Sequence, residues 1–531
     1  KIFFFLFYKI MLEEPCYDND ASSNYSLSTY ISVNAAKGLQ EITKSNLGPK
    51  GTFKILVSGS GEIKLTKNGN TLLKEMQIQN PVASLIARSI SAQNYFSGDG
   101  TTSIVLILGE LFRNIEKYLE KGIHPQILRE GLNIGRRQLE KWLPTYGFHM
   151  KEKKKSLIKM ATAFFCTKLK KENSQAVAKI IVDAILTIRR KNEIFDINLI
   201  EIMQMDNRTE IESRFVKGII LDHGARHPDM PKILHNCFIL ICNVNLEYEK
   251  TEINSVFLID SSDKREKLFA REREVVDKKI NKIIQLKRFV CKNENKGFVV
   301  INQKGIDNIS LDILCREGIL GIRRAKRKNM ERLSLLCNAI PINSLQDIGP
   351  DILGFAGLVY EQTIGEEKYT FIENVSNPFS GTILIRGNNS FLRKHTEDVI
   401  RDGLKVVKLC FDDTKYLPGG GIIEKKGNEH LFKYAEKFSG GKKFGIIALA
   451  ESLLIIPRVL NENEGKNCYQ TKQKNNNKFN NENKEKDKDF DGKNKIIFDC
   501  LTSKKQIFNS VCIVASQILQ IDEILLGRGM H

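Results

Sequence analysis

The sequence lacks the features that would place it in a disulfide-rich, zinc-binding or repeat class. It has 11 cysteines but no Cys-x-x-Cys pair, and no internal repeat is evident. Most of the cysteines lie among apolar neighbours, where a thiol behaves as a small hydrophobic side chain. An odd number of such residues indicates a reducing compartment rather than a disulfide framework. We therefore expect a cytoplasmic protein.

The N-terminus lacks the parts of a targeting segment. Residues 2–8 are apolar and aromatic, but no small-residue cleavage site follows them and the stretch is much shorter than a membrane span. The chain opens on Lys1, so we expect Met11 to be the true start and residues 1–10 to be an artefact of the gene sequence. No membrane partner is predicted.

The composition is that of a large globular protein. With 531 residues, 41% of them hydrophobic and 27% charged, the chain is long enough for about two to four domains. The net charge of +19 raises the question of a polyanionic partner. However, its lysines alternate with acidic residues, as in 264–267 and 271–274, which is typical of solvated helix faces. Only residues 323–328 form a concentrated basic run.

Periodicity divides the chain into a helical first third, an α/β middle third and a helical last third. Residues 461–496, rich in Asn, Lys and Glu, are too polar to fold and are predicted to form a solvated low-complexity insertion. The other expected elements are helices at 30–45, 71–96, 101–120, 125–143, 264–287, 390–411 and 510–521, a hairpin of strands 54–57 and 62–65, and strands at 218–221, 237–241, 297–301 and 318–322.

One motif points to chemistry. Residues 98–102 read Gly-Asp-Gly-Thr-Thr and are followed by Ser103 and an apolar run. A glycine turn that opens a helix offers free N–H groups and a favourable dipole to a phosphate. Asp99 would repel a bare phosphate, so its presence indicates a hard cation such as Mg²⁺ between the carboxylate and the phosphate oxygens. The motif therefore predicts a nucleotide with Mg²⁺.

Four further features accompany it. Leu-Gly-Pro-Lys-Gly at 47–51 and Thr-Lys-Asn-Gly at 66–69 are polar turns whose glycines permit close approach to phosphates. Asp402 lies within the expected helix 390–411, and Pro-Gly-Gly-Gly at 418–421 opens another helix. In this order the motifs resemble those of the group II chaperonins, and in particular the eukaryotic cytosolic chaperonin TRiC/CCT.

The middle third narrows the resemblance to one subunit type of that chaperonin. The similarity covers roughly residues 31–460 and 497–527, and the segments that carry it in the middle third are 221–230, 243–252, 297–307 and 323–333.

The resemblance implies a multi-domain α+β and α/β fold whose chain passes through three domains and back. It implies a mainly helical equatorial ATP-binding domain (11–145 and 402–531), a small α/β intermediate domain (146–215 and 372–401), and an α/β apical domain with a helical protrusion (216–371). It further implies an ATP hydrolase subunit in a double hetero-oligomeric ring of paralogous subunits. Such a ring encloses and folds non-native clients such as actin and tubulin, with ATP and Mg²⁺ as cofactors.

The resemblance also assigns roles to residues. Asp99 would hold Mg²⁺, Asp402 would orient the attacking water, and Lys168 would sense the γ-phosphate. On the apical helix 323–336, basic residues would bind acidic or polar client segments. The remaining nucleotide contacts would be Gly48, Pro49, Gly69, Gly100, Thr101, Thr102, Ser103, Gly420, Gly421 and Asp522, and the client-binding residues would be Arg324, Lys326, Arg327, Lys328 and Arg332.

The sequence departs from the family at three places. Asn68 stands where the family usually has an aspartate that helps activate water, and an amide cannot act as an anion or base. Residues 162–165 lack the family's Thr-Ser pair, and the Asn/Lys-rich stretch replaces the adenine-side segment. We therefore expect slow hydrolysis in this subunit.

Other interpretations stay open. A stand-alone ATPase or kinase would need a Gly-x-x-x-x-Gly-Lys-Ser/Thr loop or a kinase signature, and neither is present. A nucleic-acid-binding protein would need aromatic residues beside the basic run 323–328, which has none nearby, so no nucleic-acid partner is predicted. His223 and His227 have metal-ligand spacing, but Gly224 and Pro228 favour a loop-positioning role. Glu110 and Glu130 are expected to be surface or capping charges.

Overall fold

The computed structural model describes residues 27–59, 61–149, 153–189, 196–205, 213–247, 262–291, 296–346, 348–364, 367–387, 389–413, 415–465 and 497–523. These residues form two compact units. Unit 1 is drawn from 1–56, 66–150 and 413–531, and unit 2 from 57–65 and 151–412. Helices and sheets are mixed, as predicted, and the division into three named domains stays a prediction.

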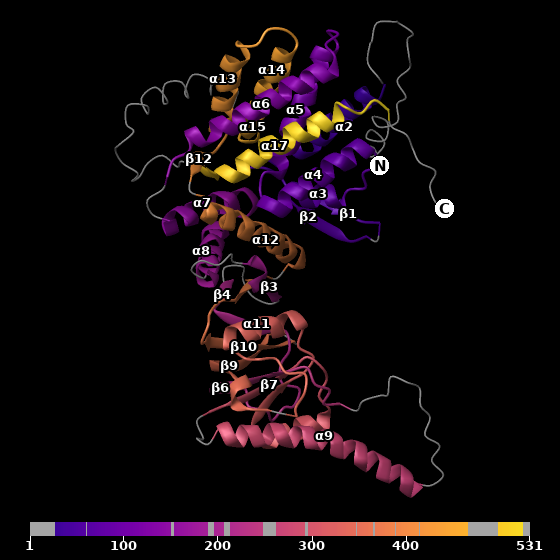
Figure 1. The fold of residues 1–531 in the computed structure, drawn as a ribbon, viewed down its shortest axis with the longest axis vertical. Helices are drawn as coiled ribbons and strands as arrows, with labels where there is room; N and C mark the ends of the chain where they lie inside the picture. The colour runs from indigo at the N-terminus through magenta and orange to yellow at the C-terminus, as the bar shows by residue number, and fades with distance from the viewer. Residues whose placement is uncertain are drawn as a thin grey trace. The chain divides into compact units, whose positions relative to one another are not determined.

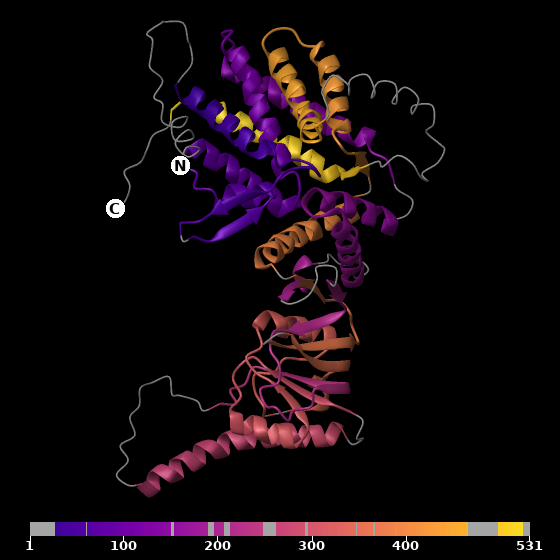
Figure 2. The same ribbon diagram turned by 180° about the vertical axis from the view of Figure 1, so that it is seen from behind.

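Unit 1 is a helical assembly built from both ends of the chain. The C-terminal helix α17 packs against α4, α5 and α6 from the first third, and both ribbon views show it lying among them (Figures 1 and 2). The elements of this unit are α2 (Leu27–Lys44), α3 (Gly69–Glu75), α4 (Pro81–Ser97), α5 (Thr101–Leu119), α6 (Pro125–Tyr146), β12 (Tyr416–Pro418), α13 (Ile422–Ala435), α14 (Lys442–Leu453), α15 (Ile455–Asn463), β13 (Phe498–Cys500) and α17 (Leu501–Ile518).

The prediction of a single helix at 71–96 is wrong, because the structure has two helices there, α3 and α4. The chain leaves the helix after Glu75, and α4 starts with Asn80 as its cap and Pro81 in its first turn. The Asn80 side chain accepts hydrogen bonds from the N–H groups of Val82 and Ala83. Proline has no N–H to donate and is favoured at this position.

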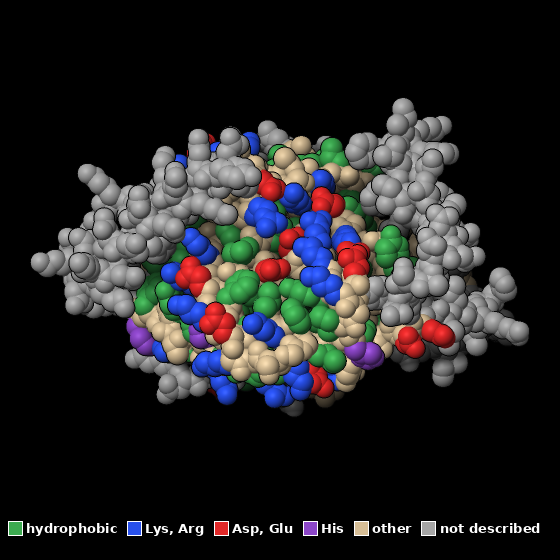
Figure 3. All heavy atoms as spheres, turned by 90° about the horizontal axis from the view of Figure 1, so that it is seen from above, with side chains coloured by type: hydrophobic (Ala, Val, Ile, Leu, Met, Phe, Trp, Pro, Cys, Tyr) green, Lys and Arg blue, Asp and Glu red, His purple; other side chains and the backbone are tan. Residues whose placement is uncertain are grey.

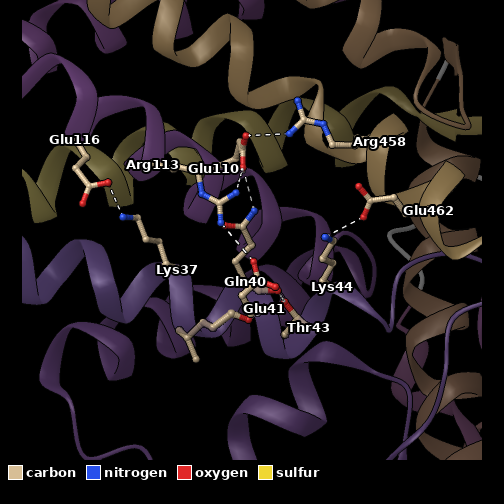
Figure 4. Close-up of polar contacts among 11 residues, drawn as sticks. Lys37, Gln40, Glu41, Thr43, Lys44, Glu110, Arg113, Glu116, Arg458 and Glu462 are labelled. Carbon is tan, nitrogen blue, oxygen red and sulfur yellow. Dashed lines mark hydrogen bonds and ion pairs between the residues drawn. The ribbon is translucent and has the colours of Figure 1, made fainter. Parts of the chain in front are cut away.

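Glu110 is not the surface charge that the sequence suggested. It lies on the buried side of α5, with 7% of its surface exposed. Its carboxylate accepts from Gln40 on α2 and from Arg113, and it pairs with Arg458 on α15 at 3.3 Å (Figure 4). This network joins three segments that are far apart in the sequence. Glu130, by contrast, is partly exposed and pairs with Lys442.

Among the described residues, one stretch is long and apolar enough to cross a membrane by length and composition. It is Lys442–Asn463, which the structure folds as α14 and α15. More than half of its most apolar window is buried inside the protein, and Ile446, Leu449 and Val459 belong to the core of unit 1. The stretch is accounted for as a pair of core helices.

Unit 2 contains a six-stranded and a three-stranded sheet. The larger has the order β5-β10-β9-β6-β7-β8, with β6, β7 and β8 parallel and the other pairs antiparallel. The smaller has the order β3-β11-β4. The strands are β3 (Ile200–Met205), β4 (Arg214–Val216), β5 (Gly218–Leu221), β6 (Ile233–Cys242), β7 (Phe298–Asn302), β8 (Ile319–Ile322), β9 (Gly354–Ile364), β10 (Glu367–Val375) and β11 (Gly381–Arg386).

The helices of unit 2 are α7 (Lys153–Lys168), α8 (Lys171–Ile188), α9 (Ser262–Val290), α10 (Asn308–Arg316), α11 (Arg327–Cys337) and α12 (Ser390–Asp412). The long charged helix predicted at 264–287 is confirmed as α9. Val276, Ile280 and Ile283 of its predicted stripe are buried in the core of the larger sheet, whereas the side chain of Leu268 lies outside the described residues.

The helix predicted at 510–521 is present as α17, but it begins at Leu501, nine residues earlier than predicted. The hairpin is confirmed as β1 (Lys54–Val57) and β2 (Ile63–Thr66), and all four predicted middle strands are present. Residues 461–463 belong to the end of α15, and residues 464 and 465 form a turn after it. Residues 466–496 of the predicted insertion lie outside the described residues, as do residues 1–10. On the face drawn in Figure 3, lysine and arginine side chains are interspersed with acidic and hydrophobic ones.

Candidate nucleotide site

The Gly-Asp-Gly turn joins two helices of unit 1. Gly98 ends α4 with φ 69° and Gly100 precedes α5 with φ 82°, and both values lie in the left-handed region that favours glycine. Ser97 Oγ donates to the Asp99 carbonyl at 2.8 Å, which fixes the turn from within. No side chain caps the start of α5, so the N–H groups of its first turn face the place where a phosphate would bind.

The three N-terminal turns meet around this helix start. A Cβ on Gly69 would lie 2.8 Å from Thr102 Oγ1, so the second turn touches the first turn of α5. A Cβ on Gly51 would lie 3.0 Å from Cε of Lys67, so the 47–51 turn touches the 66–69 turn. Gly48 has φ 86° and packs against Leu460 of α15. The predicted phosphate-binding residues of the first third are therefore brought together.

Lys67 is a residue of this site that sequence reasoning missed. It is 6% exposed, and its ammonium donates to the Pro49 carbonyl at 3.3 Å. Burial lowers the pKa of Lys67 to about 8. The structure records no carboxylate beside it among the described residues, and a buried cation without an anion is costly. The ammonium therefore suits a site that receives phosphate.

Asn68, where the resemblance leads us to expect an aspartate, has a structural role as a helix cap. It is 2% exposed and is the N-cap of α3, with Oδ1 accepting from the Asn70 N–H at 3.4 Å. An aspartate would cap a helix equally well. The Asn68 amide thus caps α3 as an aspartate would, but it does not carry the negative charge of an aspartate.

The glycine triplet opens α13, as predicted. Gly420 and Gly421 have φ 69° and 84°, and Gly421 is the N-cap of α13 without a side-chain cap. Strands β12 and β13 pair antiparallel, with Leu417 opposite Asp499. A Cβ on Gly419 would lie 2.9 Å from Oδ1 of Asp499. Asp499 is a second missed residue, because its position depends on this long-range strand pair.

Helix α17 connects the two halves of the site within unit 1. A Cβ on Gly100 would lie 2.3 Å from Cδ1 of Ile507, so the Gly-Asp-Gly turn packs directly on α17. The same helix follows β13, which carries Asp499. The Gly-Asp-Gly turn of the first third and the strand that carries Asp499 are thus both joined to α17.

Asp402 and Lys168 lie together in unit 2. Asp402 is 4% exposed on α12, and its Oδ2 is 3.3 Å from Nζ of Lys168 at the end of α7. Lys405 lies 3.8 Å from the other carboxylate oxygen. The two residues that resemblance assigned to water and γ-phosphate are therefore paired in this structure. Asp522 follows α17 and is exposed.

The residues of the predicted client surface differ in their exposure, and the start of their helix is corrected. Helix α11 begins at Arg327 rather than 323, because Arg324 has φ 58° and turns the chain before the helix. Arg324, Lys326, Arg327 and Lys328 are all exposed. Lys326 is also tied to Asp222 at 2.5 Å, and this contact raises the pKa of Lys326.

Arg332 is not part of that surface, and its predicted client-binding role is wrong. It is 2% exposed, because it lies on the buried stripe of α11. Its guanidinium donates to Ser380 Oγ (3.0 Å), to the Gly381 carbonyl (2.8 Å), to Thr382 Oγ1 (3.1 Å), to Asn329 Oδ1 (3.4 Å) and to the Glu201 carboxylate.

The loop after β5 has contacts that position it. His227 Nε2 lies 2.9 Å from the Asp312 carboxylate and His223 lies 3.7 Å from Asp222. Within the described residues, no group of three His, Cys, Asp or Glu side chains is placed to hold a metal ion.

The residues present fit a magnesium nucleotide. Glycines line the turns where a side chain would collide with Thr102, Ile507 or Asp499, so the backbone can approach a phosphate closely. Asp99, half-buried in the turn, is the one carboxylate of the motif, and the phosphates would supply the other oxygen ligands that Mg²⁺ prefers.

Comparison with known proteins agrees with this geometry. Residues 39–528 match the TCP-1/cpn60 chaperonin family. The chain is 44% identical over 501 residues to T-complex protein 1 subunit zeta-2 of Homo sapiens, which covers 93% of this chain and 94% of the relative. It is 41% identical over the same length and coverage to the subunit of the same name from Mus musculus. The subunit type that the middle third indicates is this zeta type, and the resemblance predicted from the sequence is confirmed. The chain belongs to the TCP-1/cpn60 chaperonin family.

Proposed function

We propose that the chain is the zeta-type subunit of a hetero-oligomeric cytosolic chaperonin, in which it binds ATP with Mg²⁺ and helps to fold non-native proteins. The observation that supports this most is the joining of both ends of the chain in unit 1, where three glycine turns of the first third meet at the start of α5 and α17 packs against one of them. Sequence identity over 93% of the chain to zeta-2 subunits agrees with it.

Within this proposal each group has one task. The turns around Gly48, Gly69 and Gly100 bind phosphate through backbone N–H groups, and Lys67 adds a positive charge. Asp99 would hold Mg²⁺, which supplies charge neutralisation when bound. Asp402 orients the attacking water and Lys168 detects the γ-phosphate. Because their carboxylate and ammonium are paired here, a nucleotide that engages Lys168 would release Asp402.

Turnover is expected to be slow. Asn68 can accept and donate hydrogen bonds but cannot carry the negative charge that would help to activate water. Binding and release of nucleotide would then contribute more to this subunit's role than rapid hydrolysis.

Clients are proposed to bind through the exposed basic residues before and at the start of α11. Arg324, Arg327 and Lys328 favour acidic or polar segments of clients such as actin and tubulin. Since exposed charges are screened by salt, this binding should weaken as ionic strength rises. No nucleic-acid or membrane partner is proposed.

The test is isolation of the tagged full-length chain from cells. We expect a megadalton-class particle in which related subunits are present in equal amounts, and photolabelling of this chain by 8-azido-ATP. A monomer that shifts on addition of RNA would contradict the proposal, as would a ring in which this chain takes no label.

A further inference from the structure

The end of α15 holds the 47–51 turn through one side chain. The amide nitrogen Nδ2 of Asn463 donates to the Leu47 carbonyl at 2.9 Å and to the Lys44 carbonyl at 3.1 Å. A carbonyl oxygen only accepts hydrogen bonds, so both contacts need the NH₂ group of Asn463. Lys44 is the last residue of α2, and the last carbonyls of a helix have no N–H partner within it. One amide therefore satisfies a helix end and holds the first carbonyl of the turn.

The Leu47 carbonyl belongs to the same peptide unit as the Gly48 N–H. In a trans peptide these two groups lie in one plane and point in opposite directions, so a donor that holds the carbonyl also sets the direction of the N–H. Among the residues that the structure describes, no protein acceptor is recorded for the Gly48 N–H. This N–H can therefore donate to a ligand, in a direction that Asn463 determines.

The next two carbonyls of the turn also have protein donors. The Gly48 carbonyl accepts from the Gly51 N–H at 3.2 Å, and the Pro49 carbonyl accepts from Nζ of Lys67 at 3.3 Å. Three successive carbonyls of the turn are thus held by the protein. Proline has no N–H, so the Gly48 N–H is the first donor that the turn can offer to an anion.

Helix α15 is fixed against the segment that it holds. Glu462 pairs with Lys44 at 2.9 Å, as Figure 4 shows. A Cβ on Gly48 would lie 2.7 Å from Cδ2 of Leu460, so the helix also packs directly on the turn. The half-buried Asn463 follows these two residues on the same helix, and its backbone is therefore held beside the turn.

We propose that Asn463 is a positioning residue that orients the Gly48 N–H toward a phosphate of the bound nucleotide. It does not touch the nucleotide, because its two N–H groups are used by protein carbonyls. The inference rests on the proposed nucleotide-binding function and adds a residue of the last third that sets the geometry of a turn in the first third. Since a hydrogen bond to an anion is stronger than one between neutral groups, its loss should weaken ligands that carry phosphate and spare a ligand that has none.

The experiment compares a nucleotide with its nucleoside in the assembled ring. The chain is photolabelled with 8-azido-ATP, and the label is competed with ATP or with adenosine. Asn463→Leu keeps a side chain of similar size and removes the donor. We expect it to weaken competition by ATP about fivefold, the size of one hydrogen bond, and to leave competition by adenosine unchanged. Asn463→Asp puts a carboxylate against two carbonyl oxygens, so ATP should compete less well still.

A matched control removes the same kind of contact at another place in unit 1. Nδ2 of Asn428, on α13, donates to the Ala450 carbonyl on α14 at 2.7 Å. Asn428→Leu therefore removes an amide donor that also joins two helices, but not one that holds the 47–51 turn. We expect it to lower thermal stability and to leave the ratio of ATP to adenosine competition as in the wild type.

Three results would overturn the proposal. They are unchanged competition by ATP in both Asn463 variants, equal weakening of ATP and adenosine, and the same selective loss of ATP in Asn428→Leu. Equal weakening would show that Asn463 only stabilises the fold. Asn463→Asp, whose side chain has the shape of the original, carries the comparison if Asn463→Leu does not enter the ring. Absence of label in the wild type would instead contradict the proposed function itself.

Discussion

Two buried cations, one in each unit, are neutralised in different ways. Arg332 in unit 2 meets one carboxylate and four neutral acceptors, and each of its guanidinium nitrogens has a partner. Lys504 of α17 in unit 1 meets two carboxylates, Glu424 of α13 at 2.5 Å and Asp499 of β13 at 3.1 Å, so a negative charge is left over beside the glycine triplet. The charge of Arg332 is therefore balanced by a single carboxylate, whereas the group around Lys504 carries a net negative charge.

The largest expected effect is on the stability of unit 2. Glu201→Gln removes the only carboxylate that pairs with Arg332 among the described residues, and leaves a buried charge uncompensated. Because Glu201 is 21% exposed, we expect a loss of about 3 kcal/mol, at the low end for a broken buried pair. Urea denaturation and hydrogen exchange of α11 and β3 in the assembled ring measure it.

Glu424→Gln is the matched control in unit 1. Lys504 keeps Asp499 as its counter-ion, so the loss should be about 1 kcal/mol, the value of one hydrogen bond. If Glu201→Gln and Glu424→Gln lowered the free energy of unfolding equally, Arg332 and Lys504 would not differ in how they are neutralised.

The next largest effect is expected on client binding by the exposed basic residues of unit 2. Reversing Arg327 and Lys328 to Glu should reduce client capture about tenfold at low salt, and the difference should shrink at high salt. This pair leaves the Lys326 contact with Asp222 intact. Reversing two exposed lysines of unit 1, Lys433 in α13 and Lys437 just after it, provides a control of equal charge change. Unchanged capture in the α11 variant would rule out the basic surface as a client site.

A smaller effect is expected on ATP hydrolysis, from placing a negative charge at position 68 of unit 1. If the proposed role of this position holds, Asn68→Asp should raise single-turnover ATP hydrolysis by this subunit a few-fold, because the carboxylate would supply an anion to help activate water. The cap of α3 is preserved by either residue. Asn68→Ala, which removes the cap as well, should not show the gain. Identical rates in the wild type and in Asn68→Asp would mean that the amide does not limit turnover.

The smallest effect is a pH dependence in unit 1. The ring of His430 stacks on Trp142, with centroids 5.1 Å apart, and burial followed by Lys437 and Lys433 lowers its pKa. Below the ordinary histidine pKa of about 6.5 the unfolded chain therefore takes up the proton more readily than the folded chain, and stability falls as the pH falls. His430→Phe keeps the stacking and should lose less stability than the wild type between about pH 7 and 5.5 in thermal unfolding. A parallel loss in both proteins would assign the dependence to other groups.

Local signals predict most elements and the turns of the site. Helical periodicity locates α2, α5, α9 and α12, and glycine motifs locate the turns at 48, 69, 98–100 and 420–421. Apolar spacing alone predicts one helix at 71–96. The Asn80-Pro81 start signal, which is local and present in the sequence, divides it into two.

The charged residues that the sequence did not predict for the site take their positions from contacts between distant segments. Asp499 reaches the triplet only through the β12–β13 pair, and Lys67 is buried only when two turns close on each other. A pattern could still have indicated two buried cations. Lys504 lies on the same face as Ile507, Phe508 and Val511, which are buried, and Arg332 lies on the face of Leu333 and Leu336. A cation on an apolar helix stripe predicts an internal partner.

The contact between Gly100 and Ile507 has a consequence for biosynthesis. A chain emerging from the ribosome exposes the Gly-Asp-Gly turn long before α17 has been made, since domains fold from the N-terminus as synthesis proceeds. The turn lacks the wall formed by Ile507 until α17 has been made. A nascent subunit should therefore retain a nucleotide less well before α17 has folded onto the turn than afterwards.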